Sequence, residues 1–126
     1  MKQIIHTDKA PAPIGPYNQA VLANGMLYVS GQIAINPATN ELVLSSIEEE
    51  TTQVMSNLTA VLDVAGFQFG DIVKTTIFLS DMSLFPLVND IYGSYFTDNF
   101  PARETVAVAG LPKGVNVEIS VIATKA

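Results

Sequence analysis

An Asn-Gly pair between two alternating apolar runs narrows the possible folds of this chain more than any other motif. The pair is Asn24-Gly25, and residues 19–23 and 26–32 flank it. Such a pair between strand-like runs predicts a type I′ β-hairpin, because both turn positions require a positive φ. Gly31, near the end of the second run, favours either the close approach of a ligand or backbone, or a β-bulge. We therefore expect antiparallel sheet.

Two helices are expected after the hairpin. Ser46 and Glu49 fit a capping box, apolar residues then recur at helical spacing, and Gly66 fits a left-handed C-cap. The acidic run at residues 48–50 is expected to favour the positive end of the helix dipole, and it gives little support to a metal site. A second helix is expected over residues 83–98, capped by its first serine.

Short strands surround these helices. An edge strand is expected near residues 2–7, a strand covered on both faces at residues 71–79, and two last strands at residues 105–109 and 115–124. With neighbours pairing antiparallel and both helices on one face, this order predicts an α+β sandwich formed by a single domain over residues 1–126. The second face of the sheet then has no cover within the chain.

The composition indicates self-association. Of the 126 residues, 48% are apolar and only 14% are charged, against roughly 25% charged residues in typical soluble domains. So few charges leave apolar surface that a monomer would expose to water. We therefore expect copies of the chain to cover this surface for one another.

Charge and residue counts argue against several classes of protein. The net charge is −6 and the lysines are scattered, which disfavours a nucleic-acid groove. The chain has no cysteine and one histidine, so thiol, disulfide and zinc–thiolate chemistry are excluded and a histidine metal cluster is not expected. The N-terminus lacks the pattern of a signal peptide, and no apolar run approaches the roughly 20 residues of a membrane span. We expect a soluble, cytoplasmic protein.

The single arginine and one strand carboxylate form the candidate site. Arg103 precedes a strand-like run, and Glu118 lies on the following strand, on the face away from the helices. A guanidinium binds a carboxylate through two parallel hydrogen bonds, and a glutamate can accept a proton from water. From these two residues alone, a solvated arginine and a solvent-facing glutamate remain an open alternative. A proline-rich loop at residues 10–17 presents Tyr17 either to this site or to the core.

Several sequence motifs occur together along nearly the whole chain. They are Ala12-Pro13-Ile14-Gly15-Pro16-Tyr17-Asn18-Gln19-Ala20, Tyr28-Val29-Ser30-Gly31-Gln32, Pro101-Ala102-Arg103, Leu111-Pro112-Lys113-Gly114, Val117-Glu118-Ile119 and Ile122-Ala123. In type and spacing they resemble the Rid family, also called YjgF, and its RidA branch in particular. The resemblance implies a chorismate-mutase-like α+β fold and a homotrimer, in which the uncovered sheet faces pack together and three clefts form between neighbouring subunits.

The resemblance also implies an activity. RidA members hydrolyse reactive enamines and imines, such as the 2-aminoacrylate that pyridoxal-phosphate dehydratases release, to 2-oxo acids and ammonia. The implied enzyme is a 2-iminobutanoate/2-iminopropanoate deaminase that limits metabolite damage. It uses no metal and no organic cofactor, and its ligand is a small imino or oxo acid.

The roles of individual residues follow from the same resemblance. Arg103 corresponds to the arginine that binds the substrate carboxylate, and Glu118 corresponds to the acid that orients or activates water. Further positions associated with the site are Tyr17 at the cleft wall, Ser30, Gly31 and Asn89.

Two residues beside the arginine depart from the family pattern. Thr105 stands where many relatives have cysteine, so a thiol cannot be required here, and the backbone carbonyl of Thr105 is expected to help hold the water. Glu104 is an unusual neighbour for Arg103, because an inward carboxylate would compete with the substrate. Strand alternation predicts that Glu104 points away from the site.

Three other functions stay open at this point. In the first, a trimer with the same cleft binds a 2-oxo acid or an amino-acid-like metabolite without chemistry. An RNA-cleaving or translation-inhibiting role is disfavoured by the net charge of −6 and the single arginine. The last alternative is a structural trimer without activity.

Overall fold

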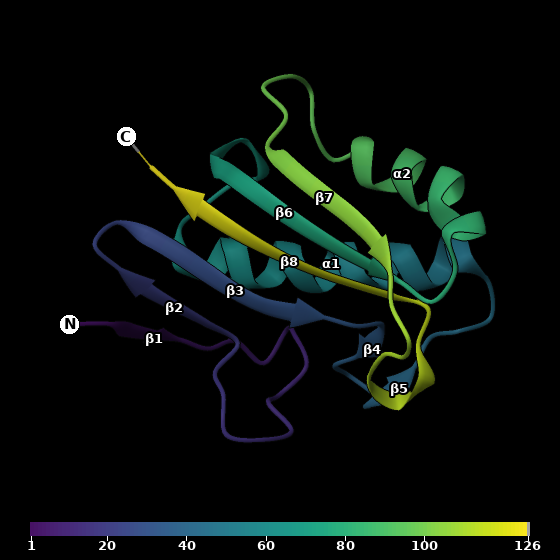
Figure 1. The fold of residues 1–126 in the computed structure, drawn as a ribbon. Coiled ribbons are helices and arrows are strands. Elements are labelled where there is room, and N and C mark those ends of the chain that lie inside the picture. Colours follow the sequence, from purple (N-terminus) through teal and green to yellow (C-terminus); the bar gives the residue numbers. More distant parts are fainter. Residues whose placement is uncertain (126) are drawn as a thin grey trace.

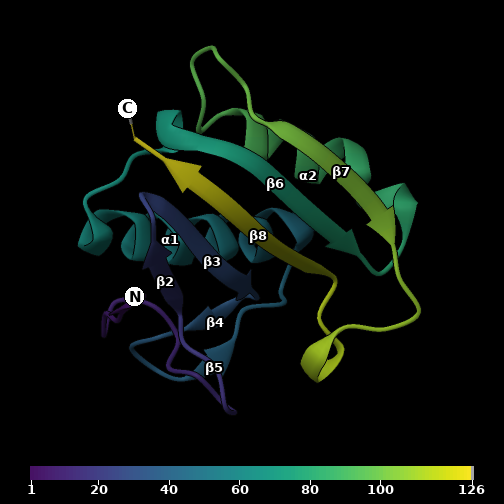
Figure 2. The same ribbon diagram turned by 60° about the vertical axis from the view of Figure 1, so that its left-hand side comes forward.

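The computed structural model describes residues 1–125, which form a sheet with two helices packed on one face (Figure 1). The six strands of the sheet are β1 (Gln3–Ile5), β2 (Ala20–Ala23), β3 (Met26–Gln32), β6 (Ile72–Leu79), β7 (Ala102–Ala107) and β8 (Val117–Thr124). The helices are α1 (Ile47–Ala65) and α2 (Phe85–Gly93), and both stay behind the sheet in the turned view of Figure 2. The predicted α+β class, with both helices on one face, is confirmed.

Smaller elements fill the connections. A separate hairpin pairs β4 (Ile35–Asn36) with β5 (Glu41–Leu42), within a segment whose turn residues gave no strand prediction. Three 3-10 turns are η1 (Phe69–Asp71), η2 (Met82–Leu84) and η3 (Pro112–Gly114). None of the helices within residues 1–125 is long and apolar enough to cross a membrane.

The strand order of the large sheet is β1-β2-β3-β8-β6-β7. The last strand, β8, is inserted between β3 and β6 and pairs antiparallel with both. Strand β7 pairs parallel with β6, because α2 carries the chain back across the helix face before β7 begins. The expectation that all neighbouring strands pair antiparallel is therefore wrong for β6 and β7. As a result β7 and β8, which follow one another in sequence, are separated by β6.

The Asn-Gly hairpin is confirmed. Asn24 and Gly25 have φ values of 52° and 76°, and the strands on either side pair in register from Ala23 and Met26. The register between β3 and β8 then shifts between Val29 and Gln32, so the end of β3 is a β-bulge. Strand β1 lies at the edge of the sheet, as expected.

Helix α1 begins and ends where the sequence predicts. The Ser46 hydroxyl accepts a hydrogen bond from the Glu49 backbone N–H at 3.1 Å, and Gly66 closes the helix with a φ of 82°. The reciprocal half of the capping box is different, because the Glu49 carboxylate accepts from the Ser45 hydroxyl. Glu50 is not at the surface with the other acids of the first turn but is 1% exposed.

Helix α2 is shorter than expected. Asp81, not Ser83, is the N-terminal cap of η2, since its carboxylate accepts from the Ser83 backbone N–H at 2.8 Å. Helix α2 follows directly and ends at Gly93, well before residue 98. Glycine and serine are weak helix formers, and the Ser94 hydroxyl donates to the Ile91 carbonyl at 2.6 Å, which competes with continuation of the helix.

Strand β6 contains an irregularity that alternation alone did not predict. Its register with β8 shifts between Ile72 and Lys74, so Ile72 is buried while Val73 is 42% exposed. From Thr75 onward the strand alternates between buried residues on the helix face and half-buried residues on the other face. Strict alternation along residues 71–79 would place Val73 on the face of Thr75, but a β-bulge restarts the alternation after Val73.

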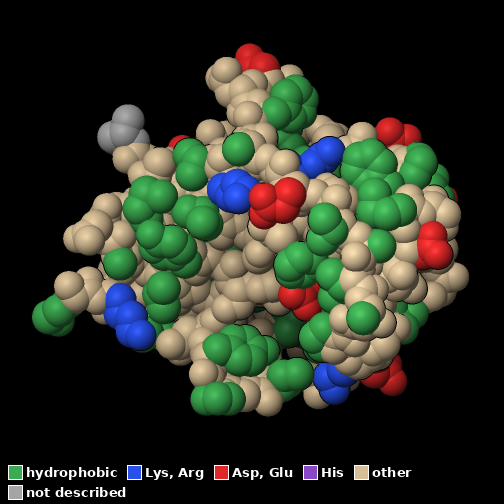
Figure 3. Space-filling view, viewed as in Figure 1, with side chains coloured by type: hydrophobic (Ala, Val, Ile, Leu, Met, Phe, Trp, Pro, Cys, Tyr) green, Lys and Arg blue, Asp and Glu red, His purple; other side chains and the backbone are tan. Residues whose placement is uncertain are grey.

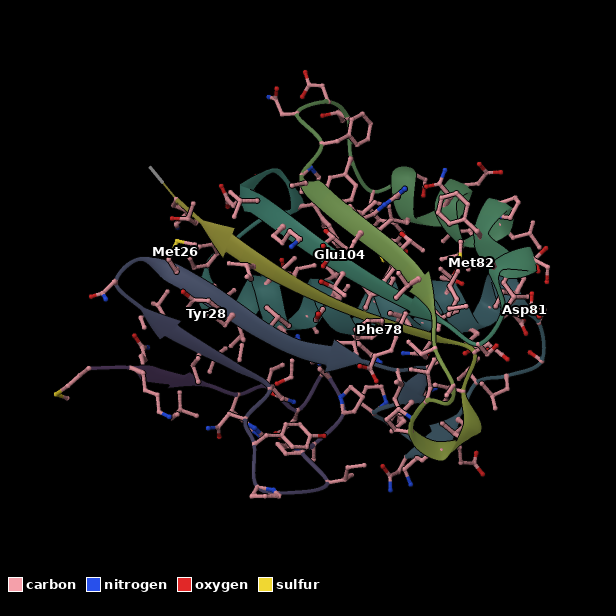
Figure 4. The ribbon with its side chains drawn as sticks, in the orientation of Figure 1. Met26, Tyr28, Phe78, Asp81, Met82 and Glu104 are labelled. Carbon is pink, nitrogen blue, oxygen red and sulfur yellow. The ribbon has the colours of Figure 1, made fainter. Side chains whose placement is uncertain are left out.

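The sheet face away from the helices is not covered by any helix of residues 1–125 (Figures 1 and 3). Figure 4 labels Met26, Tyr28, Phe78 and Glu104 on this open face, and Tyr28 is 44% exposed. One ion pair lies on it, with Lys74 Nζ 3.1 Å from a Glu104 carboxylate oxygen. Large apolar side chains around a single ion pair make this face suited to burial against another molecule.

Candidate functional site

Glu118 lies on the open face of β8, opposite Phe78 on β6. Its half-buried carboxylate rests directly against Gly31 in the β-bulge of β3. A Cβ at Gly31 would overlap a carboxylate oxygen of Glu118 and would lie 2.8 Å from its Cδ and 3.0 Å from its Cγ. The predicted bulge at Gly31 is confirmed, and the group that approaches this glycine closely is the Glu118 side chain, where the sequence analysis expected a ligand or backbone. Burial raises the pKa of Glu118 above its ordinary value of 4.5.

A cavity of about 360 Å³ lies in front of Glu118. Its walls are the proline-rich loop, the end of β3 and the turn before β8, and most of its lining is apolar. Of the residues that line it, only Glu118 and Tyr17 have side chains that titrate. The lining residues are Pro11, Ala12, Ile14, Tyr17, Gln19, Ser30, Gly31, Gln32, Ile33, Ile35, Pro112 and Glu118.

The loop that carries Tyr17 is held in place by hydrogen bonds. The Tyr17 hydroxyl accepts from the Ile14 backbone N–H at 3.3 Å, and the Ser30 hydroxyl donates to the Asn18 carbonyl at 2.6 Å. The buried Gln19 amide accepts from the Thr7 N–H at 2.7 Å and donates to the carbonyls of Thr7, Ala10 and Pro11. Tyr17, Ser30, Gly31 and Glu118, all predicted site residues, thus line one cavity.

Arg103 occupies a different part of the molecule. It lies on the edge strand β7, and its Nη1 donates to the Asn89 side-chain carbonyl on α2 at 2.7 Å. The guanidinium carbon lies 5.4 Å from the centre of the Phe85 ring and 5.3 Å from that of Tyr92. These contacts orient the guanidinium, and they leave further N–H donors for a carboxylate ligand. Together with Phe100, Pro101 and four residues of α2, Arg103 lines a second cavity of about 520 Å³.

The sheet register shows that Arg103 and Glu118 face opposite ways. In the parallel pair of β6 and β7, Arg103 is the partner of Thr75, which is fully buried on the helix face. Glu118 is the partner of Phe78, which points to the open face. The two cavities have no lining residue in common. The two side chains therefore do not meet within one chain.

The neighbours of Arg103 follow the same alternation. Thr105 is the partner of Ile77 on the helix face, and its hydroxyl is buried with no hydrogen-bond partner within residues 1–125. Glu104 points to the open face, where it accepts from the Thr76 hydroxyl at 2.8 Å and pairs with Lys74. Hydrogen bonds from Thr76 and Lys74 lower the pKa of Glu104. The prediction that Glu104 turns away from Arg103 is confirmed.

Three buried polar side chains near the cavity were missed by the sequence analysis. Gln19 supports the proline-rich loop, Glu50 accepts three hydrogen bonds at the start of β8, and Asn57 donates to backbone carbonyls beside the cavity. The signal for Glu50 was its spacing, since it lies four residues before Val54 and therefore on the apolar stripe of α1. No group of three or more potential metal-binding side chains gathers within residues 1–125.

Comparison with known proteins extends this description. A family model described as Endoribonuclease L-PSP matches residues 7–125. A RutC family protein from Saccharolobus solfataricus is 50% identical over 125 residues, covering 99% of this chain and 99% of the relative. A 2-iminobutanoate/2-iminopropanoate deaminase from Homo sapiens is 46% identical over 123 residues, covering 98% of this chain and 90% of the relative. The crystal structure of a Rid family protein from Yersinia pestis matches with a TM-score of 0.96 at 53% identity, covering 99% of this chain and 100% of that chain.

These matches agree with the mixed α+β fold and span nearly the whole chain. The chain belongs to the Rid family, also called YjgF. Its membership confirms the resemblance drawn from the motifs, and the identity to named deaminases supports imine deamination in general.

Proposed function

We propose that the protein hydrolyses 2-imino acids, formed from enamines such as 2-aminoacrylate, to 2-oxo acids and ammonia. The observation that carries this proposal is the Glu118 carboxylate, whose pKa is raised by burial and which faces a small, mostly apolar cavity. A general base works best when its pKa approaches the working pH. Similarity to named deaminases favours this chemistry over simple metabolite binding.

The chemical step needs one proton acceptor and one water molecule. In the proposed mechanism Glu118 accepts a proton while the water oxygen bonds to the imine carbon, whose nitrogen is already protonated. This gives a tetrahedral 2-amino-2-hydroxy acid. Glu118 then returns the proton to the nitrogen. As the carbon–nitrogen bond breaks, Glu118 takes the proton of the hydroxyl group, so that ammonia and the 2-oxo acid leave, and the ammonia finally accepts this proton as ammonium. The apolar walls around the carboxylate limit competing water, and Tyr17 bounds the cavity beside it.

Arg103 is proposed to bind the substrate carboxylate. Its planar guanidinium can form two parallel hydrogen bonds to a carboxylate, and its contacts with Asn89, Phe85 and Tyr92 hold it ready to do so. Because Arg103 and Glu118 lie on opposite faces of one sheet, the proposal requires Arg103 from a neighbouring copy. Ser30, Gly31, Asn89 and the backbone of Thr105 complete the proposed substrate site.

The proposed assembly is a homotrimer in which the open sheet faces pack together. This arrangement would bury Tyr28 and the apolar residues around it. The proposal also includes a cytoplasmic location, no cofactor, and neither nucleic acid nor a membrane as a partner. A net charge of −6 supports the absence of nucleic-acid binding.

The test couples a threonine or serine dehydratase to the protein and times the appearance of the 2-oxo acid. The wild type should shorten the delay, whereas Arg103→Ala and Glu118→Gln should lose most of this effect while staying folded. Glu41→Gln removes an exposed carboxylate on β5 and serves as the matched control. A folded Arg103→Ala variant with full activity would refute the proposal.

The same variants separate deamination from the other functions. If the protein only binds a metabolite, Glu118→Gln should retain 2-oxobutanoate binding and the wild type should show no turnover. If it cleaves RNA, as the description of the family model suggests, the wild type should degrade a labelled RNA and Glu118→Gln should not. Either result would replace the proposed activity.

A further inference from the structure

Glu50 is a buried carboxylate in the first turn of α1, and only 1% of its surface is exposed. One of its oxygens accepts from the backbone N–H of Asn116 at 2.7 Å and of Val117 at 3.0 Å. The other oxygen accepts from Nδ2 of Asn116 at 2.9 Å. No ion pair within residues 1–125 involves Glu50. The charge is therefore held only by neutral donors, all of them at the start of β8.

Such a group carries a high desolvation cost, and it is tolerated only with its hydrogen bonds complete. An apolar residue at this position on the stripe of α1 would avoid that cost. An apolar residue, however, cannot hydrogen-bond to the backbone of a strand and so cannot fix the position of that strand along the helix. Glu50 does so at two successive amides, that of Asn116 just before β8 and that of Val117 at its first position, which places the beginning of this strand relative to α1.

Asn116, which is held by Glu50, also hydrogen-bonds to Ser80, the residue that follows β6. The Asn116 backbone carbonyl accepts from the Ser80 N–H at 2.9 Å, and its side-chain oxygen accepts from the Ser80 hydroxyl at 2.9 Å. Glu118 follows two residues later, as the second residue of β8. The Glu118 side chain lies in the space that a Cβ at Gly31 would fill, so a displacement of β8 would move its carboxylate relative to the bulge and the cavity.

Helix α1 also hydrogen-bonds to residues that line the cavity. Asn57 lies seven residues after Glu50, about two helical turns away. Its Nδ2 donates to the backbone carbonyls of Ile33 and Ile35 at 3.0 Å each, and both isoleucines line the cavity. Buried polar groups on α1 thus hold two backbone segments, one that lines the cavity with Glu118 and one that leads into β8.

We propose that Glu50 is a positioning residue for the active site: by anchoring the start of β8 it places the Glu118 carboxylate against Gly31 and the cavity. The inference rests on the proposed deamination, in which Glu118 activates water. In the proposed site Arg103 comes from a neighbouring copy, and the hydrogen bonds of Glu50 all go to Asn116 and Val117, so we expect Glu50 to act on the chemical step and not on binding of the substrate carboxylate.

The test swaps the donor and the acceptor in the hydrogen bond between the side chains of Glu50 and Asn116. In Glu50→Gln the introduced amide oxygen can still accept from the two backbone N–H groups, but its NH₂ group meets the NH₂ group of Asn116. Adding Asn116→Asp restores a donor–acceptor pair, leaves an oxygen to accept from the Ser80 hydroxyl, and keeps the net charge unchanged. Val61→Ala removes buried volume from the same helix, eleven residues after Glu50, and is the matched control for loss of stability.

Three readouts are compared for wild type, Glu50→Gln, the double variant and Val61→Ala: the thermal midpoint, kcat and KM, and the pKa of Glu118 followed by carboxyl-carbon NMR. We expect Glu50→Gln to lower kcat at least about tenfold, with KM within about twofold, because a displaced base loses part of its contribution. The pKa of Glu118 should fall toward its ordinary value, because a displaced carboxylate loses part of the burial that raises it. The double variant should recover both quantities, and Val61→Ala should change only the midpoint.

The proposal is wrong if Glu50→Gln lowers the midpoint as Val61→Ala does while kcat and the pKa of Glu118 stay at wild-type values. It is also wrong if the double variant recovers neither folding nor these values. Absence of turnover in the wild type would instead overturn the proposed deamination. In that case the pKa of Glu118 across the four proteins still decides whether Glu50 positions this carboxylate.

Discussion

Replacing Gly31 by alanine should remove most of the activity while leaving the fold almost unchanged. The added Cβ would overlap a carboxylate oxygen of Glu118 and would lie 2.8 Å from Cδ and 3.0 Å from Cγ of the same side chain. Gly31 is not among the residues with positive φ, so its backbone accepts alanine without strain. All three close atoms belong to one flexible side chain. The Glu118 carboxylate must therefore rotate away from the bulge.

The expected magnitudes of the two effects differ widely. An off-rotamer side chain costs about 0.5–1.5 kcal/mol, and a permitted Gly→Ala change returns about 0.4–1 kcal/mol through the unfolded state. The net change in the free energy of unfolding should therefore stay within about 1 kcal/mol. A correctly placed general base contributes about 10²–10⁴-fold in rate, which corresponds to about 2.7–5.4 kcal/mol in the activation free energy.

The assay combines dehydratase-coupled turnover with urea unfolding of the same preparations. Gly110→Ala is the matched control, because a Cβ there has no neighbour within 4 Å and Gly110 has no positive φ. Gly31→Ala should lose at least about a hundredfold in kcat, and Gly110→Ala should match the wild type. A folded Gly31→Ala protein with wild-type turnover would show that the position of Glu118 against the bulge is irrelevant to the reaction.

Two further outcomes follow from single contacts. Burial raises the pKa of Glu118 in the folded state above its ordinary value of 4.5. Above this folded-state pKa the ionised carboxylate destabilises the fold. The loss of stability disappears as the pH falls through the folded-state pKa toward 4.5. Glu118→Gln should therefore raise the thermal midpoint near pH 8 and have no such effect near pH 4; an equal gain at both values would contradict the burial argument. The Tyr92 hydroxyl bonds to the fully buried Thr75 hydroxyl at 2.9 Å, so Tyr92→Phe should lower the free energy of unfolding by about 1–3 kcal/mol in urea. Tyr95→Phe, on the same aromatic cluster, should change it much less.

Local signals in the sequence predicted local structure well. The Asn-Gly turn, the capping of α1 and its closing glycine depend on the chemistry of neighbouring residues, and each is found where expected. The alternation of β8 likewise predicted that Glu118 points away from the helices. What failed is non-local. The insertion of β8 beside β6, the parallel entry of β7 and the bulge at Val73 depend on which strands pair, and pairing leaves little trace in one strand's own residues.

The same contrast between local and non-local information applies to the candidate site. Motifs carried by the family resemblance named Tyr17, Ser30, Gly31 and Glu118, and these four line one cavity. Placing Arg103 on the strand next to Glu118 was wrong, because β6 separates their strands and the two side chains use opposite faces. The buried role of Glu50 was not predicted, because the helix dipole was sufficient to explain the whole acidic run at residues 48–50.

Mixing two inactive variants shows whether a site is shared between copies of the chain. Arg103→Ala keeps Glu118, and Glu118→Gln keeps Arg103, so neither variant alone has a complete site. If each site takes one residue from each of two neighbouring copies, equal amounts assembled together at random restore both residues in about a quarter of the sites. We therefore predict recovery of about a quarter of wild-type turnover over the whole mixed population, once native mass spectrometry shows that it contains assemblies of both variants. Mixed assemblies that remain inactive would contradict a site built from Arg103 of one copy and Glu118 of the next.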